Sequence, residues 1–78
     1  MLTLADLKEN EKAIVLKVRA EAELKQRLAS FGLRKNSTIK IKALSLTKST
    51  IEIEIGASMI ALRFDEAKEI EVQKVWKI

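Results

Sequence analysis

The sequence predicts a small, mostly β domain: an antiparallel barrel of about five strands with one α-helix and short helical turns. Two observations indicate this fold class. Residues 38–43 and 50–55 alternate between isoleucine and polar residues, which is the period of half-buried strands. A helical apolar spacing upstream of them stops at Gly32, and no later connection is long enough for the crossover that parallel strands need. We therefore expect residues 1–78 to form one domain.

The N-terminal segment is expected to form a single helical turn. Thr3 stands three residues ahead of Asp6, a weak variant of the capping box. Leu4 and Leu7 can then share an inward face. In the charged connector that follows, Asn10 is the natural turn residue because asparagine tolerates positive φ.

A first strand is predicted over residues 13–19, which are rich in β-branched side chains. Simple alternation places three of its side chains inward: Ile14, Leu16 and Val18.

The helix is expected over about residues 21–31, ended by Gly32 in the left-handed conformation. Leu33 then lies where it can pack back onto Leu28, the contact of a Schellman-type ending. Four apolar side chains of this region are expected in the core: Leu24, Leu28, Phe31 and Leu33.

Residues 38–43 and 50–55 are expected to form an antiparallel hairpin with its isoleucines inward. Opposite charges would then share the solvent face: Lys40 and Lys42 with Glu52 and Glu54. Such cross-strand pairs are worth roughly 0.2 to 1 kcal/mol each and help to fix the register.

The C-terminal third supplies the remaining strands. Residues 59–64 alternate and should point three side chains inward: Ile60, Leu62 and Phe64. Asp65 is placed to cap a short helical turn. Residues 70–72 form the last strand, and Trp76 continues its parity.

Composition argues against an enzyme. The chain has no His, Cys or Tyr, and therefore lacks the usual general base, the usual nucleophile pairs and the ligands that transition metals prefer. The cluster of Asp65, Glu66 and Glu69 alternates with Lys68, which is typical of a solvated turn. No catalytic residue, cofactor or metal site is predicted.

The chain is expected to be cytoplasmic, without a membrane span of its own. No apolar run approaches the ~20 residues that a bilayer crossing requires, and the N-terminus lacks the basic flank and apolar run of a secretory signal.

A helix placed between the first two strands favours an SH3-like barrel. The OB-fold, the main alternative, usually carries its helix later in strand order.

Several motifs together resemble the FeoA family, over about Thr3 to Val72. They are Leu4-x-x-Leu7, Arg27-Leu28-x-x-Phe31-Gly32-Leu33, a Lys/Ile strand, Gly56, Ile60-Ala61-Leu62-Arg63 and Glu66-Ala67-x-x-Ile70-x-Val72. The chain departs from the family in having Asn10 and Asn36 where glycine is usual in two turns, and in a shorter loop over residues 45–49.

The resemblance implies a small SH3-like accessory protein of ferrous iron transport, in its stand-alone form. Its expected partner is the membrane ferrous iron transporter, which carries a cytosolic GTP-binding domain. The sequence makes no prediction of oligomeric state.

Charge suggests where a partner could bind. Residues 34–48 hold five cations and no acid, whereas residues 52–71 hold six acids and two cations. This asymmetry suits attraction to an acidic protein face, or to the cytoplasmic membrane surface beside a transporter. The candidate partner-binding residues are Arg27, Arg34, Lys35, Arg63 and Trp76.

Two other functions fit the same features. A net charge of +4 is compatible with a small nucleic-acid-binding barrel, but the stacking platform of such proteins is missing. The second alternative is the C-terminal SH3-like module of a metal-dependent transcription regulator, because such regulators carry a domain that resembles this family.

Overall fold

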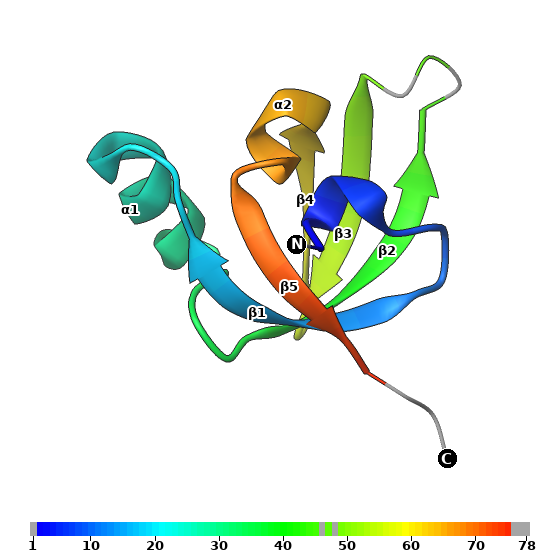
Figure 1. Cartoon of the computed structure of the whole chain (residues 1–78), viewed down its shortest axis with the longest axis horizontal. Helices are drawn as coiled ribbons and strands as arrows, with labels where there is room; N and C mark the ends of the chain where they lie inside the picture. The colour runs from blue at the N-terminus through cyan, green and yellow to red at the C-terminus, as the bar shows by residue number, and fades with distance from the viewer. Residues whose placement is uncertain (1, 46, 48, 76–78) are drawn as a thin grey trace.

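One antiparallel sheet of five strands is the framework of the computed structural model, which describes residues 2–45, 47 and 49–75 (Figure 1). The strands are β1 (Lys12–Val18), β2 (Thr38–Leu44), β3 (Thr50–Ile55), β4 (Ser58–Arg63) and β5 (Ile70–Lys74). The helices are the 3-10 turn η1 (Leu4–Asp6), α1 (Ala22–Ser30) and α2 (Phe64–Ala67). In space the strands follow the order β4-β3-β2-β1-β5. The predicted strand number, antiparallel pairing and helix between the first two strands are confirmed.

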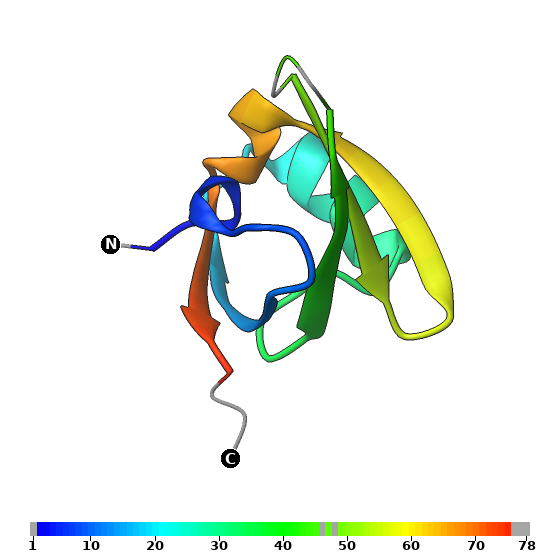
Figure 2. The same ribbon diagram turned by 90° about the vertical axis from the view of Figure 1, so that its right-hand side faces the viewer.

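Two irregularities in pairing accompany the curl of the sheet that Figure 2 shows. The register between β1 and β5 shifts between Val15 and Lys17, and that between β2 and β3 shifts between Ile41 and Ala43. A bulge bends its strand and increases the local twist. The two bulges therefore help the sheet to wrap around its core.

The bulge in β1 overturns the predicted inward set of that strand. Val15 and Val18 are buried, whereas Leu16 is 38% exposed and Ile14 is only half-buried. The extra residue at position 16 breaks the alternation, so residues three apart face the core. The prediction that Ile14 and Leu16 point inward was wrong.

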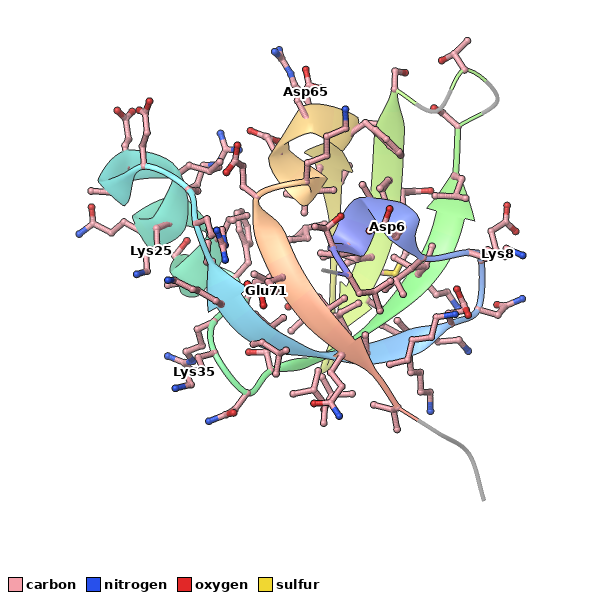
Figure 3. All side chains as sticks on the ribbon, in the orientation of Figure 1. Asp6, Lys8, Lys25, Lys35, Asp65 and Glu71 are labelled. Carbon is pink, nitrogen blue, oxygen red and sulfur yellow. The ribbon has the colours of Figure 1, made fainter. Side chains whose placement is uncertain are left out.

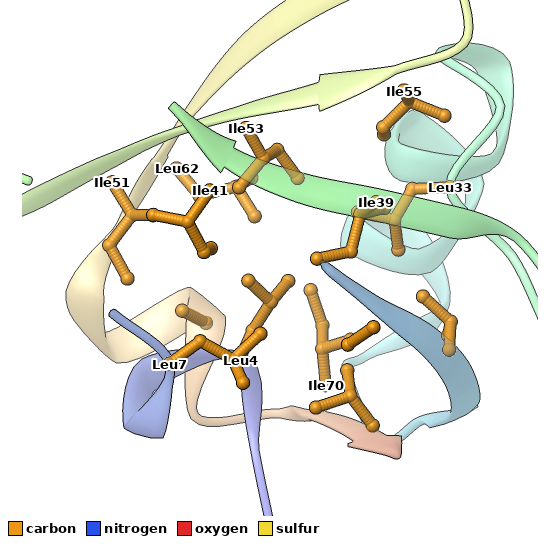
Figure 4. Packing of buried hydrophobic residues seen from close by; sticks show 14 of the residues in the cluster. Leu4, Leu7, Leu33, Ile39, Ile41, Ile51, Ile53, Ile55, Leu62 and Ile70 are labelled. Atoms are coloured by element: carbon orange, nitrogen blue, oxygen red, sulfur yellow. The ribbon is translucent and has the colours of Figure 1, made fainter. Parts of the chain in front are cut away.

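The isoleucines of β2 and β3 form the centre of the core, as predicted (Figure 4). Leu4 from η1 and Leu7, the residue that follows η1, close one side of it, and Ile70 from β5 another. The fully buried large side chains are Leu4, Leu28, Leu33, Ile39, Ile41, Ile51, Ile53, Leu62, Ile70 and Val15. At roughly 25 cal/mol per Å² of apolar surface removed from water, this core is the main source of folding free energy.

The end of α1 has the predicted Schellman geometry. Gly32 has φ +94°, its N–H donates to the Ala29 carbonyl at 2.9 Å, and the Leu33 N–H donates to the Leu28 carbonyl at 3.0 Å. Leu33 is thereby turned into the core. Phe31, the last residue before this reversal, is 47% exposed, so its predicted place in the core was wrong.

Both asparagine turns have the conformation expected of them. Asn10 has φ 69° and Asn36 has φ 75°, the region that glycine and asparagine tolerate best. The Asn36 N–H donates to the Val15 carbonyl at 2.7 Å, which holds this turn against β1.

The predicted charge pairs across β2 and β3 are present only in part. Lys40 lies opposite Glu54, but the bulge at position 42 places Ala43, and not a lysine, opposite Glu52. The alternation of isoleucine and lysine in the sequence does not show that residue 42 is an extra residue in the pairing of β2 with β3.

Phe64 and Asp65 differ from their predicted roles. Phe64 begins α2 and is half-buried rather than being the last inward residue of a strand. Arg63 is the N-cap, and Asp65 lies inside the first helical turn. The strand therefore ends one residue earlier than the alternation indicates.

The two edge strands of the sheet differ in whether another segment of the chain pairs with them. At β5, Thr3 forms a bridge with Glu71, and the Val72 N–H donates to the Leu2 carbonyl at 2.9 Å. The N-terminal segment thus covers that edge. Strand β4, at the other end of the sheet, pairs with β3 in unbroken register and, among the residues that the structure describes, with no further strand.

None of the helices in the described part of the chain has the length and apolar character needed to cross a bilayer.

An ion pair joins the connector after η1 to β5. Glu11 Oε2 lies 2.9 Å from Lys74 Nζ, and Glu11 Oε1 accepts a hydrogen bond from the Lys8 N–H at 2.6 Å. The bond to Lys74 and then the one to Lys8 lower the pKa of Glu11 below its ordinary value, because both favour the charged carboxylate.

The bulge in β1 leads to a first testable prediction. Val15→Ala should lower the free energy of unfolding by about 2 kcal/mol, because it removes two fully buried methyl groups. Leu16→Ala removes more atoms but from the surface, and should change stability by less than about 0.5 kcal/mol. Urea unfolding of the two variants decides; a larger loss for Leu16→Ala would contradict the bulge.

Glu11 makes a second prediction. The pKa of the Glu11 carboxyl is lower in the folded state than in the unfolded state, where it is about 4.3. The charged carboxylate therefore stabilises the fold at pH values above about 4.3. That contribution is lost as pH falls through the lower, folded-state pKa. Glu11→Gln should therefore flatten the fall in stability below pH ~4.3, measured by urea unfolding at several pH values. Glu9→Gln is the control, and an equal flattening there would contradict the assignment.

Candidate functional site

A groove of about 400 Å³ runs between α1 and β4, the edge strand of the sheet. Figure 2 shows β4 curving along the side of the molecule on which α1 lies. The groove is lined by Arg27, Leu28, Phe31, Met59, Ile60, Ala61 and Leu62. Its walls are therefore apolar apart from one cation at the end of α1.

Two large apolar side chains of this groove are open to solvent. Phe31 is 47% exposed and Met59 is 52% exposed. Leu28 and Leu62, which also line the groove, are buried. An exposed aromatic and a methionine beside a groove are typical of protein interaction sites, because they can be desolvated against a partner without first being uncovered.

Local sequence explains both exposures. The helix ends at Gly32, so Phe31 is carried past the packed face of α1 while Leu33 takes the inward position. In β4, Met59 and Ala61 alternate with the inward Ile60 and Leu62. One side of the groove thus comes from a helix ending and the other from a strand edge.

Glu66 links the two sides of the site through its two carboxylate oxygens. Oε2 accepts a hydrogen bond from Arg27 Nη2 at 3.0 Å, and Oε1 accepts one from the Arg63 N–H at 3.0 Å. The carboxylate therefore ties the end of α1 to the start of α2. Arg27, a predicted partner-binding residue, is held in this intramolecular pair, although its side chain remains 57% exposed.

The other described residues among the predicted partner-binding set do not line the groove, and Arg63 lies on a different element from Arg34 and Lys35. Arg63 is exposed at the end of β4, and no carboxylate lies within 4.0 Å of its guanidinium among the described residues. Arg34 and Lys35 are exposed in the turn between α1 and β2 and do not line the groove. Figure 3 shows Lys35 pointing outward from this turn. Trp76 lies outside the described residues.

Sequence reasoning missed Phe31 and Met59 as candidate site residues. Phe31 was assigned to the core from its helical spacing. The outward parity of Met59 was visible, but its value depends on β4 lying at a sheet edge, which the sequence does not specify.

A second hollow of about 310 Å³ lies between the start of α1 and α2. It is lined by Arg19, Ala20, Glu21, Leu24, Asp65, Glu66 and Glu69. The Arg19 guanidinium lies at its border and pairs with Glu71 at 3.1 Å. Within the described residues, no three His, Cys, Asp or Glu side chains are grouped so that they could hold a metal ion.

The Glu66 contacts make a third prediction. Glu66→Ala should lower the free energy of unfolding by about 1 to 2 kcal/mol, because it leaves the Arg63 N–H and Arg27 without their acceptor. Glu69→Ala, in the turn after α2, is the matched control and should cost less than about 0.5 kcal/mol. If urea unfolding gave equal losses of unfolding free energy for the two variants, the contacts of the Glu66 carboxylate would not stabilise the fold.

Comparison with known proteins identifies the family. A family model described as the FeoA domain matches residues 2–74. A candidate Fe(2+) transport protein A from Campylobacter jejuni is 46% identical over 74 residues, covering 95% of this chain and 100% of that protein.

Solved structures agree with this assignment. The FeoA protein from Chlorobium tepidum superposes with a TM-score of 0.92 at 27% identity, over 96% of this chain and 71% of that one. A FeoA from Stenotrophomonas maltophilia, solved with zinc and described as a prokaryotic SH3 domain protein, gives a TM-score of 0.81 at 26% identity, over 94% and 91% of the two chains. The predicted SH3-like fold is therefore confirmed, and the chain belongs to the FeoA domain family.

Proposed function

We propose that this chain is a non-enzymatic, cytoplasmic accessory protein of ferrous iron uptake that binds the cytosolic GTP-binding part of a membrane iron transporter. Membership of the FeoA family supports the link to iron transport. The Campylobacter jejuni relative bears the name of an Fe(2+) transport protein. The FeoA of Stenotrophomonas maltophilia has been put forward as a ferrous iron transport activating factor.

The observation that carries the proposal is the open apolar groove between α1 and β4. Phe31 and Met59 expose much of their surface there, and Arg63 follows Leu62 at the end of β4 as an exposed cation. Such a site suits the recognition of a protein surface that offers apolar and acidic groups. The residues around the groove include no pair of the kind used for nucleophilic or general base catalysis.

The proposed mechanism is differential binding. A domain that performs no chemistry can alter a transporter only if its binding free energy differs between two conformations of that partner. The GTP-bound and GDP-bound states of the GTP-binding part are the natural pair. Binding to one state more tightly shifts the transporter toward it.

Nucleic acid fits the surface less well. Lys12 and Lys40 lie opposite each other on β1 and β2, but Glu54 follows as the next partner of Lys40 across the sheet. This acid interrupts the positive stripe that a phosphate backbone would follow. A filter-binding assay with single-stranded RNA at several salt concentrations distinguishes this function from the proposed one.

The fourth prediction concerns the transporter. The purified chain should bind the GTP-binding part of the transporter with different affinities in its GTP-analogue and GDP states, measured by calorimetry. Phe31→Ser should weaken binding at least about tenfold, since it removes an exposed apolar side chain that lines the groove.

The matched control is Leu16→Ser, which changes an exposed leucine on β1 away from the groove. It should bind like the unchanged protein. Absence of binding in both nucleotide states would contradict the proposed partner. Equal weakening by the two variants would remove the groove as the binding site.

A further inference from the structure

Strand β4 has backbone groups that point away from the sheet. The Phe64 N–H donates to the Ser49 carbonyl at 2.9 Å, on the β3 side. Because backbone groups of an antiparallel strand alternate between its two sides, Ile60 and Leu62 also bond toward β3. The N–H and C=O groups of Met59 and Ala61 therefore face the free edge.

The next residue in this series confirms the alternation. The Arg63 N–H does not bond to β3 but to Glu66 Oε1 at 3.0 Å. The free stretch of edge is therefore closed at one end by Glu66. It offers two successive outward-facing residues, Met59 and Ala61, to an incoming strand.

This edge lacks the usual protection against strand addition. Soluble proteins cover an edge, bulge it, or place Lys or Pro on it. The edge at β5 is covered by Leu2 and Thr3. By contrast, residues 59–62 of β4 contain neither charge nor proline, and their register with β3 is unbroken.

We infer that an extended segment of the partner adds to β4 as a sixth strand and places an apolar side chain in the groove beside Phe31. This inference rests on the proposed function and specifies how the transporter's GTP-binding part is bound. Alternate side chains of an added strand face opposite ways. Those on the inner side meet Phe31 and Ile60, and those on the outer side meet Ala61 and Arg63.

Charge favours a segment that carries an acidic residue. The Arg63 guanidinium has no carboxylate within 4.0 Å in the part of the chain that the structure describes. A carboxylate on the outer side of the added strand, opposite Arg63, would supply its partner. The expected occupant is therefore an extended peptide segment with one apolar and one acidic side chain.

A second copy of this chain fits the edge less well. Antiparallel pairing of two β4 strands about Ala61 places Met59 of one copy opposite Arg63 of the other. Parallel pairing places the two Arg63 side chains opposite each other, where like charges repel. Neither arrangement supplies the carboxylate that Arg63 lacks.

The fifth prediction is tested by amide hydrogen exchange in the full chain, with and without the transporter's GTP-binding part. Binding should slow exchange at Met59 and Ala61 by about tenfold or more, since their N–H groups become bonded. The N–H groups of Ile60 and Leu62, already bonded to β3, are the internal control. Binding without protection of Met59 and Ala61 would overturn the inference while leaving the proposed partner intact. Absence of binding would overturn both.

Two variants test the same geometry. Ala61→Pro removes an edge-facing N–H that β3 does not use and should weaken binding roughly tenfold, whereas Ala61→Val keeps it and should not. Arg63→Gln should weaken binding about threefold, with Lys42→Gln on β2 as the charge-matched control. If Ala61→Pro fails to fold, the exchange experiment and the Arg63→Gln variant test whether the partner segment adds to β4. A dimer through β4 in the absence of the partner, seen by sedimentation, would overturn the inference.

Discussion

The structure depends on the reversal of the chain at Gly32. A residue with φ +94° is needed there to bring the Leu33 N–H back to the Leu28 carbonyl, and a side chain with a Cβ adopts that conformation only with strain. The reversal has two results. It turns Leu33 into the core, where it meets the isoleucines of the sheet, and it leaves Phe31 on the surface beside β4. Core and groove thus arise from the same turn.

Much of the fold could be predicted because its signals are local. The alternating isoleucines of β2 and β3, the helix ending and the two asparagine turns each depend on a few neighbouring residues. The inward set of β1 could not be predicted. Its bulge at Leu16 is defined by pairing with β5, more than fifty residues later in the chain, and no local pattern records such a distant register.

The candidate site was less predictable than the fold for a related reason. Cations can be counted in a sequence, but Arg27 is already paired with Glu66, from a different helix. The groove joins α1 to β4, and its openness follows from the place of β4 at the end of the strand order. Family motifs indicated the link to iron transport, because they record spacing along the chain. They do not say which side chains stay uncovered.

The covered edge at β5 limits the stoichiometry of assembly. Leu2 and Thr3 pair with Val72 and Glu71 at that edge, so β4 is the edge left open in the part of the chain that the structure describes. A protein with two open edges could stack into fibres, each copy joining the next. With a single open edge, strand addition at β4 would end after one partner, which would favour a complex of one copy with one partner over edge-to-edge polymers.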